Sequence, residues 1–123
     1  MSQAIEAHRK AVDADLQTMA STLVEVMGRA LVAGMVGIRN PKTISRWASG
    51  EVTSVRDRYS EERLIAAFQV VSFLQEYLGN ETIRAFLLGM APELDDEAPA
   101  IALREGNFKG AMKAARNLVA GGY

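Results

Sequence analysis

Apolar residues recur at intervals of three and four along this chain, and that spacing favours helices over strands. In the N-terminal part they stand at Ile5, Val12, Leu16, Met19, Leu23 and Val26, with His8 on the same stripe. No segment alternates polar and apolar residues, which is the pattern of a half-buried strand. The sequence therefore predicts an all-α fold, a helical bundle without a sheet.

Residues that start and stop helices divide the first half of the chain. We expect one long amphipathic helix from Ile5 to Val26, or two in line, ending near Gly28. A short helix should follow over residues 29–36 and close at Gly37. Asn40 and Pro41 are typical of a helix start, and this third helix should stop at Gly50.

The second half of the chain contains four further predicted helices. Ser60 is expected to cap a helix over residues 60–78 that is apolar on nearly every side, and this helix should be central and buried. Asn80 should cap a short helix over residues 82–88. Two more are predicted, from Pro99 to Gly106 and over residues 107–120.

The segment from Gly28 to Gly50 has the spacing of a helix-turn-helix. Ala33 provides the small residue that a crossing helix requires, and Gly37, four residues on, provides the left-handed turn. Ile38 and Ile44 are apolar residues suited to the core beneath the second helix, and the ring of Trp47 should pack there too. The turn is one residue longer than in the commonest pattern of this motif.

The exposed face of that second helix carries donors suited to DNA. The segment from Arg39 to Arg58 is basic, although the net charge of the whole chain is −1. The same residues also suit a helical hairpin with an ordinary solvated face that binds no DNA. The predicted DNA-binding residues are Arg39, Asn40, Lys42, Thr43, Ser45, Arg46 and Arg56.

Composition argues against several other classes of protein. The chain has no cysteine and a single histidine, so thiolate catalysis and the usual zinc sites are excluded. Asp95, Asp96 and Glu97 are consecutive rather than spaced along a helix face, and we interpret them as solvated. We expect no metal, no cofactor, no enzymatic activity and no membrane span, and hence a cytoplasmic protein.

Two parts of the sequence resemble a known family in the order of their motifs. Residues 28–78, with KTISRWASGEV followed by RLIAAF, resemble the Xre-like helix-turn-helix of bacterial antitoxins. Residues 78–123 resemble the toxin-binding module of the Xre/MbcA/ParS-type antitoxins. The matching features there are Leu78-Gly79-Asn80, IRAFLLGMAPEL, Pro99, Arg104-Glu105-Gly106 and AMKAARNLV. The resemblance covers about four fifths of the chain.

This resemblance implies an antitoxin with two binding surfaces. Its partner would be a toxin with a RES domain, which consumes NAD⁺, or a related ADP-ribosyl-transferring enzyme. The C-terminal part would cover the toxin's active site, and the helix-turn-helix would bind operator DNA and repress the shared operon. Carried over by position, the toxin contacts are Phe108, Lys109, Lys113, Arg116, Asn117 and Tyr123.

The residues themselves support this division only in part. Lys109, Lys113 and Arg116 form a basic stripe at helical spacing, which also suits a merely solvated face. We predict residues 1–27 as an N-terminal helix that either pairs in a homodimer or packs on its own domain, residues 28–77 as the DNA-binding region, and residues 78–123 as the toxin-binding module. A stand-alone transcriptional regulator and a helical adaptor that binds only protein are the alternatives.

Overall fold

The computed structural model describes residues 15–121, and within them the chain is helical with no strand. The elements are α2 (Leu16–Met27), α3 (Arg29–Val36), α4 (Pro41–Ser49), α5 (Arg58–Gln75), α6 (Asn80–Leu88), the short 3₁₀ helix η1 (Pro92–Leu94), α7 (Pro99–Arg104) and α8 (Phe108–Ala120). In this described part, the nearest approach to a sheet is one isolated bridge between Ala91 and Glu97. The all-α fold class is confirmed.

Helix α2 begins at Leu16, which is later than a single helix from Ile5 to Val26 would begin. Asp15 is in an extended conformation, and its carboxylate accepts a hydrogen bond from the Thr18 N–H at 2.8 Å. A continuous helix from Ile5 to Val26 is therefore wrong at Asp15, which is the N-cap. Ile5, His8 and Val12 lie outside the described residues, as does the rest of the segment 1–14.

The Asp15 cap depends on the charge of its carboxylate. Hydrogen bonds from Thr18, above all the one from its backbone N–H, lower the pKa of Asp15 below its ordinary value. A carboxyl group whose pKa is lowered by folding stabilises the folded chain above its unfolded pKa, and this contribution disappears as the pH falls through the folded pKa. The start of α2 should accordingly loosen in acid.

Helices α3 and α4 have the bounds that the sequence predicts. Gly28 separates α2 from α3, and Gly37 ends α3 in the left-handed conformation, with φ 81° and ψ 26°. Asn40 caps α4, Pro41 is its first residue, and Gly50 ends it. The turn of the predicted helix-turn-helix therefore comprises residues 37–40.

The cap of the fourth predicted helix lies three residues earlier than expected. Asp57 rather than Ser60 caps α5, because its carboxylate accepts the Tyr59 N–H at 3.1 Å. Ser60 lies buried inside the first turn, where its hydroxyl donates to the other oxygen of Asp57. The helix ends at Gln75 rather than near Leu78. Asn80 likewise lies inside α6, and Gly79 precedes that helix without a side-chain cap.

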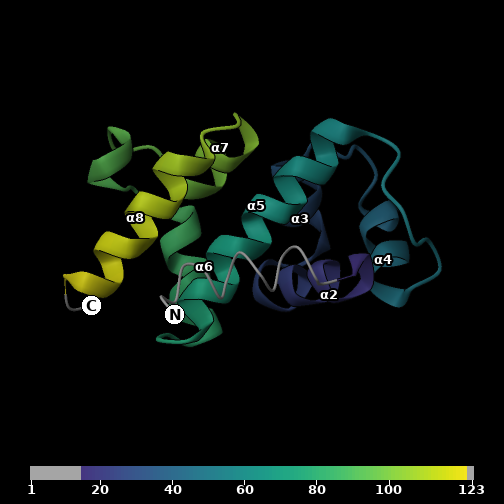
Figure 1. Ribbon diagram of the computed structural model, residues 1–123, viewed down its shortest axis with the longest axis horizontal. Helices are drawn as coiled ribbons and strands as arrows, with labels where there is room; N and C mark the ends of the chain where they lie inside the picture. Colours follow the sequence, from purple (N-terminus) through teal and green to yellow (C-terminus); the bar gives the residue numbers. More distant parts are fainter. Residues whose placement is uncertain (1–14, 122–123) are drawn as a thin grey trace.

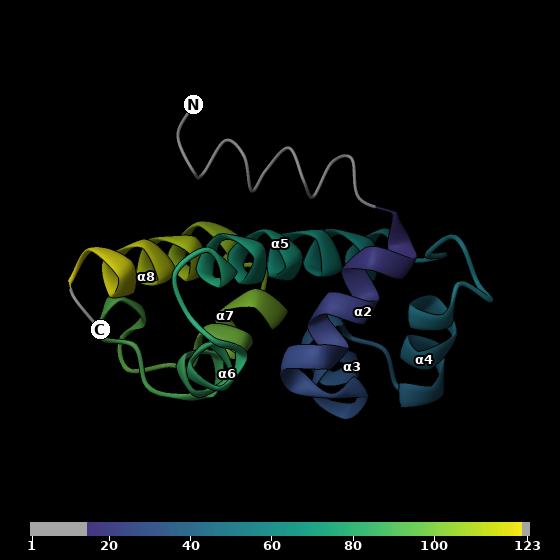
Figure 2. The same cartoon turned by 90° about the horizontal axis from the view of Figure 1, so that it is seen from below.

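Helix α5 crosses the middle of the described part of the molecule and is shared by its two halves (Figure 1). Helices α2 and α3 pack against one side of α5 and carry α4, whereas α6, α7 and α8 pack against another side of α5 (Figure 2). Its middle is almost fully buried, as the apolar pattern predicts. Buried side chains from both halves form one continuous core.

Membrane-spanning potential is low in the described residues. No single helix among them is both long enough and apolar enough to cross a bilayer. Helices α2 and α3 would meet that test only if they were taken together, and they are bent by 116° at Gly28.

Candidate nucleic-acid interface

Helix α4 separates apolar and polar side chains on opposite faces. Ile44 is 0% exposed and Trp47 is 3% exposed, so both residues belong to the core, as the sequence predicts. Lys42 and Arg46, one turn apart, are exposed on the other face, with Thr43 and Ser45 half-exposed beside them. A helix that presents basic and hydroxyl donors along one open face has the shape and chemistry to enter a major groove.

The turn before α4 is held from several sides. Ala33 is buried in α3, which packs against α4, and its carbonyl accepts the Ile38 N–H at 2.8 Å. A Cβ added to Gly37 would lie 2.7 Å from Cε1 of Tyr59, so this position requires glycine for space as well as for its left-handed backbone. From α2, the Ser21 hydroxyl donates to the carbonyl of Ala48 at 3.0 Å. These contacts fix the direction in which α4 points.

Asn40 caps α4, and the same side chain is also predicted to contact DNA. Its side-chain oxygen accepts the Lys42 N–H at 3.0 Å and so caps α4. Asn40→Ala should lower the free energy of unfolding by roughly 0.5–2 kcal/mol, measured by urea denaturation. Asn40→Asp keeps the cap and adds a negative charge beside DNA, so it should weaken DNA binding with little loss of stability. Equal DNA affinity for Asn40→Asp and wild type would contradict a DNA contact at this position.

The other predicted DNA-binding residues lie around the same helix. Arg39 is exposed in the turn, and Arg56 is exposed in the loop that follows α4. Arg46 and Arg56 line one groove of about 660 Å³ between α4 and residues 51–57, and Glu51 and Asp57 line it as well. The structure thus gathers the predicted basic residues on one end of the molecule.

These basic side chains are not neutralised within the described residues. The ion pair there joins Arg58 to Glu62 at 3.2 Å, outside α4. Arg39, Lys42, Arg46 and Arg56 form no salt bridge with any carboxylate in residues 15–121. Four unpaired positive charges around one exposed helix favour an anionic partner such as a phosphate backbone.

Arg29 is a member of this surface that the sequence reasoning missed. Its Nη1 donates to the hydroxyl oxygen of Ser45 at 3.0 Å, so Ser45 acts as an acceptor in this contact and keeps its O–H as a donor. Arg29 is exposed at the start of α3. The two residues are 16 positions apart, and only the crossing of α3 with α4 brings them together. No local spacing signals such a contact.

The predicted toxin-binding residues that the structure describes lie on α8, in the other half of the molecule (Figure 1). Lys109, Lys113, Arg116 and Asn117 are exposed. Phe108 is only partly exposed, because its ring packs against the core near the guanidinium of Arg63. Asn117 donates from Nδ2 to the Glu93 carboxylate at 3.1 Å. Tyr123 lies outside the described residues.

Comparison with protein families, characterised proteins and solved structures found no match to this chain. The site is therefore interpreted from its own geometry. Within residues 15–121, no three His, Cys, Asp or Glu side chains are grouped closely enough to hold a metal ion. The surface around α4 carries positive charges and hydrogen-bond donors, which are features of a binding site.

Proposed function

We propose that this protein is a cytoplasmic, homodimeric DNA-binding antitoxin that uses α4 to bind operator DNA and α8 to bind its toxin. One observation carries the DNA-binding part. Ile44 and Trp47 anchor α4 in the core while Lys42 and Arg46 project from its opposite face, directly after a left-handed glycine turn. A recognition helix requires this combination of a fixed backbone and an exposed basic face.

The charges around α4 also predict how binding responds to salt. Each Lys or Arg that contacts a phosphate displaces counterions from the duplex, so the logarithm of affinity should fall linearly with the logarithm of salt concentration. With four unpaired basic residues there, affinity should fall by an order of magnitude or more between low and physiological salt. Fluorescence anisotropy with the duplex immediately upstream of this reading frame measures the effect.

The toxin-binding part of the proposal is supported by the resemblance of residues 78–123 and by the surface of α8. Lys109, Lys113 and Arg116 lie on the side of this helix opposite its buried alanines, Ala111, Ala114 and Ala115. An exposed basic stripe complements an acidic surface on a partner protein. The resemblance of residues 78–123 implies, as this partner, a RES-type toxin encoded beside this protein.

Charge reversal on α8 tests the proposal without removing a helix from the fold. Lys113→Glu with Arg116→Glu changes only exposed side chains, so the free energy of unfolding should stay within about 0.5 kcal/mol. We expect affinity for the co-encoded toxin to fall by more than tenfold, because two attractive contacts become repulsive. Isothermal titration calorimetry with the purified toxin measures this fall.

The same double variant should bind the upstream duplex as the wild type does, since α5 lies between α8 and α4 (Figure 1). Its matched control is Glu61→Lys with Glu62→Lys, which changes two exposed charges on α5. Undiminished toxin affinity in the α8 variant would contradict the antitoxin assignment. Operator binding without any toxin binding would favour the stand-alone regulator.

A further inference from the structure

Two turns that are remote in sequence lie beside the first turns of α5. One is the helix-turn-helix turn at Gly37, and the other joins α7 to α8 at Gly106. Both glycines have positive φ, 81° and 87°. Tyr59 and Arg63, which are one helical turn apart on α5, contact these two turns.

Tyr59 contacts both turns with a single side chain. The edge of its ring lies against Gly37, where an added Cβ would be 2.7 Å from Cε1. Its hydroxyl donates to the carbonyl of Arg104, immediately before the second turn, at 3.0 Å. The side chain is 44% exposed, so burial of apolar area explains only part of its placement. Tyr59 bridges the two halves of the molecule.

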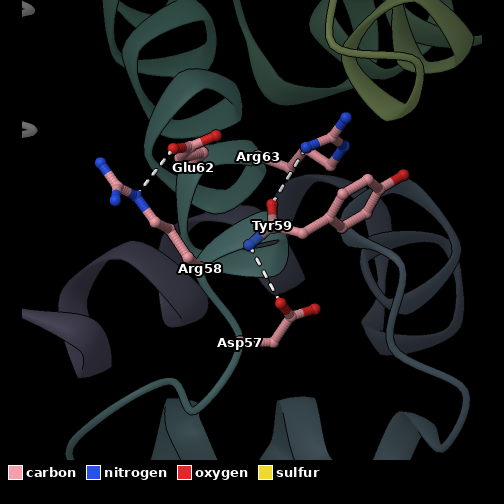
Figure 3. Close-up of polar contacts among 5 residues, drawn as sticks. All are labelled: Asp57, Arg58, Tyr59, Glu62 and Arg63. Carbon is pink, nitrogen blue, oxygen red and sulfur yellow. Dashed lines mark hydrogen bonds and ion pairs between the residues drawn. The ribbon is translucent and has the colours of Figure 1, made fainter.

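Arg63 fills the space behind Tyr59 and is almost completely buried. Its Cζ lies 3.3 Å from the centroid of the Tyr59 ring, and Nη1 donates to the carbonyl of Tyr59 at 3.2 Å (Figure 3). Its Nε donates to the carbonyl of Arg104 at 2.8 Å. A Cβ added to Gly106 would lie 3.0 Å from Nη2. The guanidinium therefore touches the second turn on one side and Tyr59 on the other.

Such an arrangement tolerates little displacement. A buried guanidinium is stable only while its hydrogen bonds and ring contact are kept, so a shift of the second turn must move Arg63 or leave its charge unsatisfied. A displaced Arg63 pushes on the Tyr59 ring, which it contacts face to face, and that ring already abuts Gly37. Arg63 is buried, and packed interiors transmit such strain because they hold few voids.

We infer that Tyr59 and Arg63 are positioning residues that couple the turn at Gly106 to the turn at Gly37. A structural change at the start of α8 is thereby transmitted to the turn that precedes α4. The coupling itself follows from these contacts alone. Its consequence, that an event on the C-terminal helices alters how α4 meets DNA, rests on the proposed function.

Reciprocal alanine substitutions in the full-length chain test the coupling. Gly106→Ala is strained at its φ and presses on Nη2 of Arg63. It should accelerate hydrogen exchange of the Ile38 amide, which closes the other turn by donating to Ala33. Gly37→Ala should accelerate exchange of the Asn107 amide, which donates to Ala102. Each remote effect should be on the order of threefold or more, relative to the Val71 amide in the buried middle of α5.

The matched control is Gly79→Ala, the same substitution at a glycine with open space around it and ordinary backbone angles. It should leave both reporter amides unchanged. Adding Tyr59→Ala should abolish both remote effects, because the bridging ring is gone. Should that variant not fold, the reciprocal pair remains decisive without it. The inference is overturned if each alanine affects only its own turn, or if Val71 accelerates equally.

DNA binding provides a separate readout. Gly106→Ala should weaken binding to the upstream duplex by about threefold, although residue 106 lies outside the proposed interface. If remote exchange changes while DNA affinity does not, the coupling stands and its consequence for DNA binding is wrong. If the exchange at Ile38 does not change, the coupling itself is wrong.

Discussion

Arg46→Ala should weaken binding to the upstream duplex by roughly ten- to a hundredfold, the loss expected when one bidentate base contact is removed. The side chain is exposed on α4, lies one turn from Lys42 and forms no salt bridge within the described residues. Its removal should therefore leave the folded chain intact. Fluorescence anisotropy at fixed salt measures the affinity, and circular dichroism verifies the helix content.

Two further measurements show what kind of contact Arg46 makes. If Arg46 contacts a base, its loss should reduce discrimination between the upstream duplex and a scrambled duplex. If it contacts a phosphate, affinity should fall for both sequences alike, and the salt slope should decrease by about one. Arg58→Ala is the matched control, because Arg58 is an exposed arginine that pairs with Glu62 outside α4. An unchanged affinity for Arg46→Ala would show that α4 is not the recognition helix.

Trp47→Ala should lower the free energy of unfolding by about 3–5 kcal/mol, the range for removing a large buried aromatic side chain. Trp47 is 3% exposed and anchors α4 in the common core. A domain of this size typically has about 5–15 kcal/mol of stability, so the variant should be close to unfolding. Trp47 is the only tryptophan in the chain, so urea titrations must be followed by circular dichroism rather than by tryptophan fluorescence.

The matched control for this prediction is Lys42→Ala on the same helix. Lys42 is exposed, and its loss should change stability by no more than about 0.5 kcal/mol while weakening DNA binding. The two substitutions thus distinguish the residue that holds α4 in the core from a residue of its proposed contact with DNA. A Trp47→Ala variant as stable as the wild type would mean that α4 is not held by the core as described here.

The two predicted binding surfaces lie in different halves of one continuous core. Helix α4 packs with α2 and α3, and α8 packs with α5, α7 and η1. Because α5 belongs to both halves, a boundary at residue 77 separates segments of the chain that share a core. Surface substitutions at either end should therefore act independently, whereas substitutions near Tyr59 should affect both ends.

Local chemistry made much of this structure predictable from the sequence. The ends of α3 and α4 follow from Gly37, Asn40, Pro41 and Gly50, because a cap or a left-handed turn depends on residues within a few positions. The buried and exposed faces of α4 follow from the helical repeat. Asp57 and Ser60 are two possible capping residues three positions apart. The prediction from sequence was Ser60, whereas Asp57 caps α5.

Tertiary structure alone decided the contacts that connect these helices. Nothing in the spacing places Arg29 on Ser45, Tyr59 between Gly37 and Arg104, or the charged Arg63 inside the protein. These pairs are separated by 16 to 45 positions, and they meet because whole helices pack their apolar faces together. A periodic pattern specifies which face of a helix is buried, but the partner of that face depends on the shapes of all the segments that share the core.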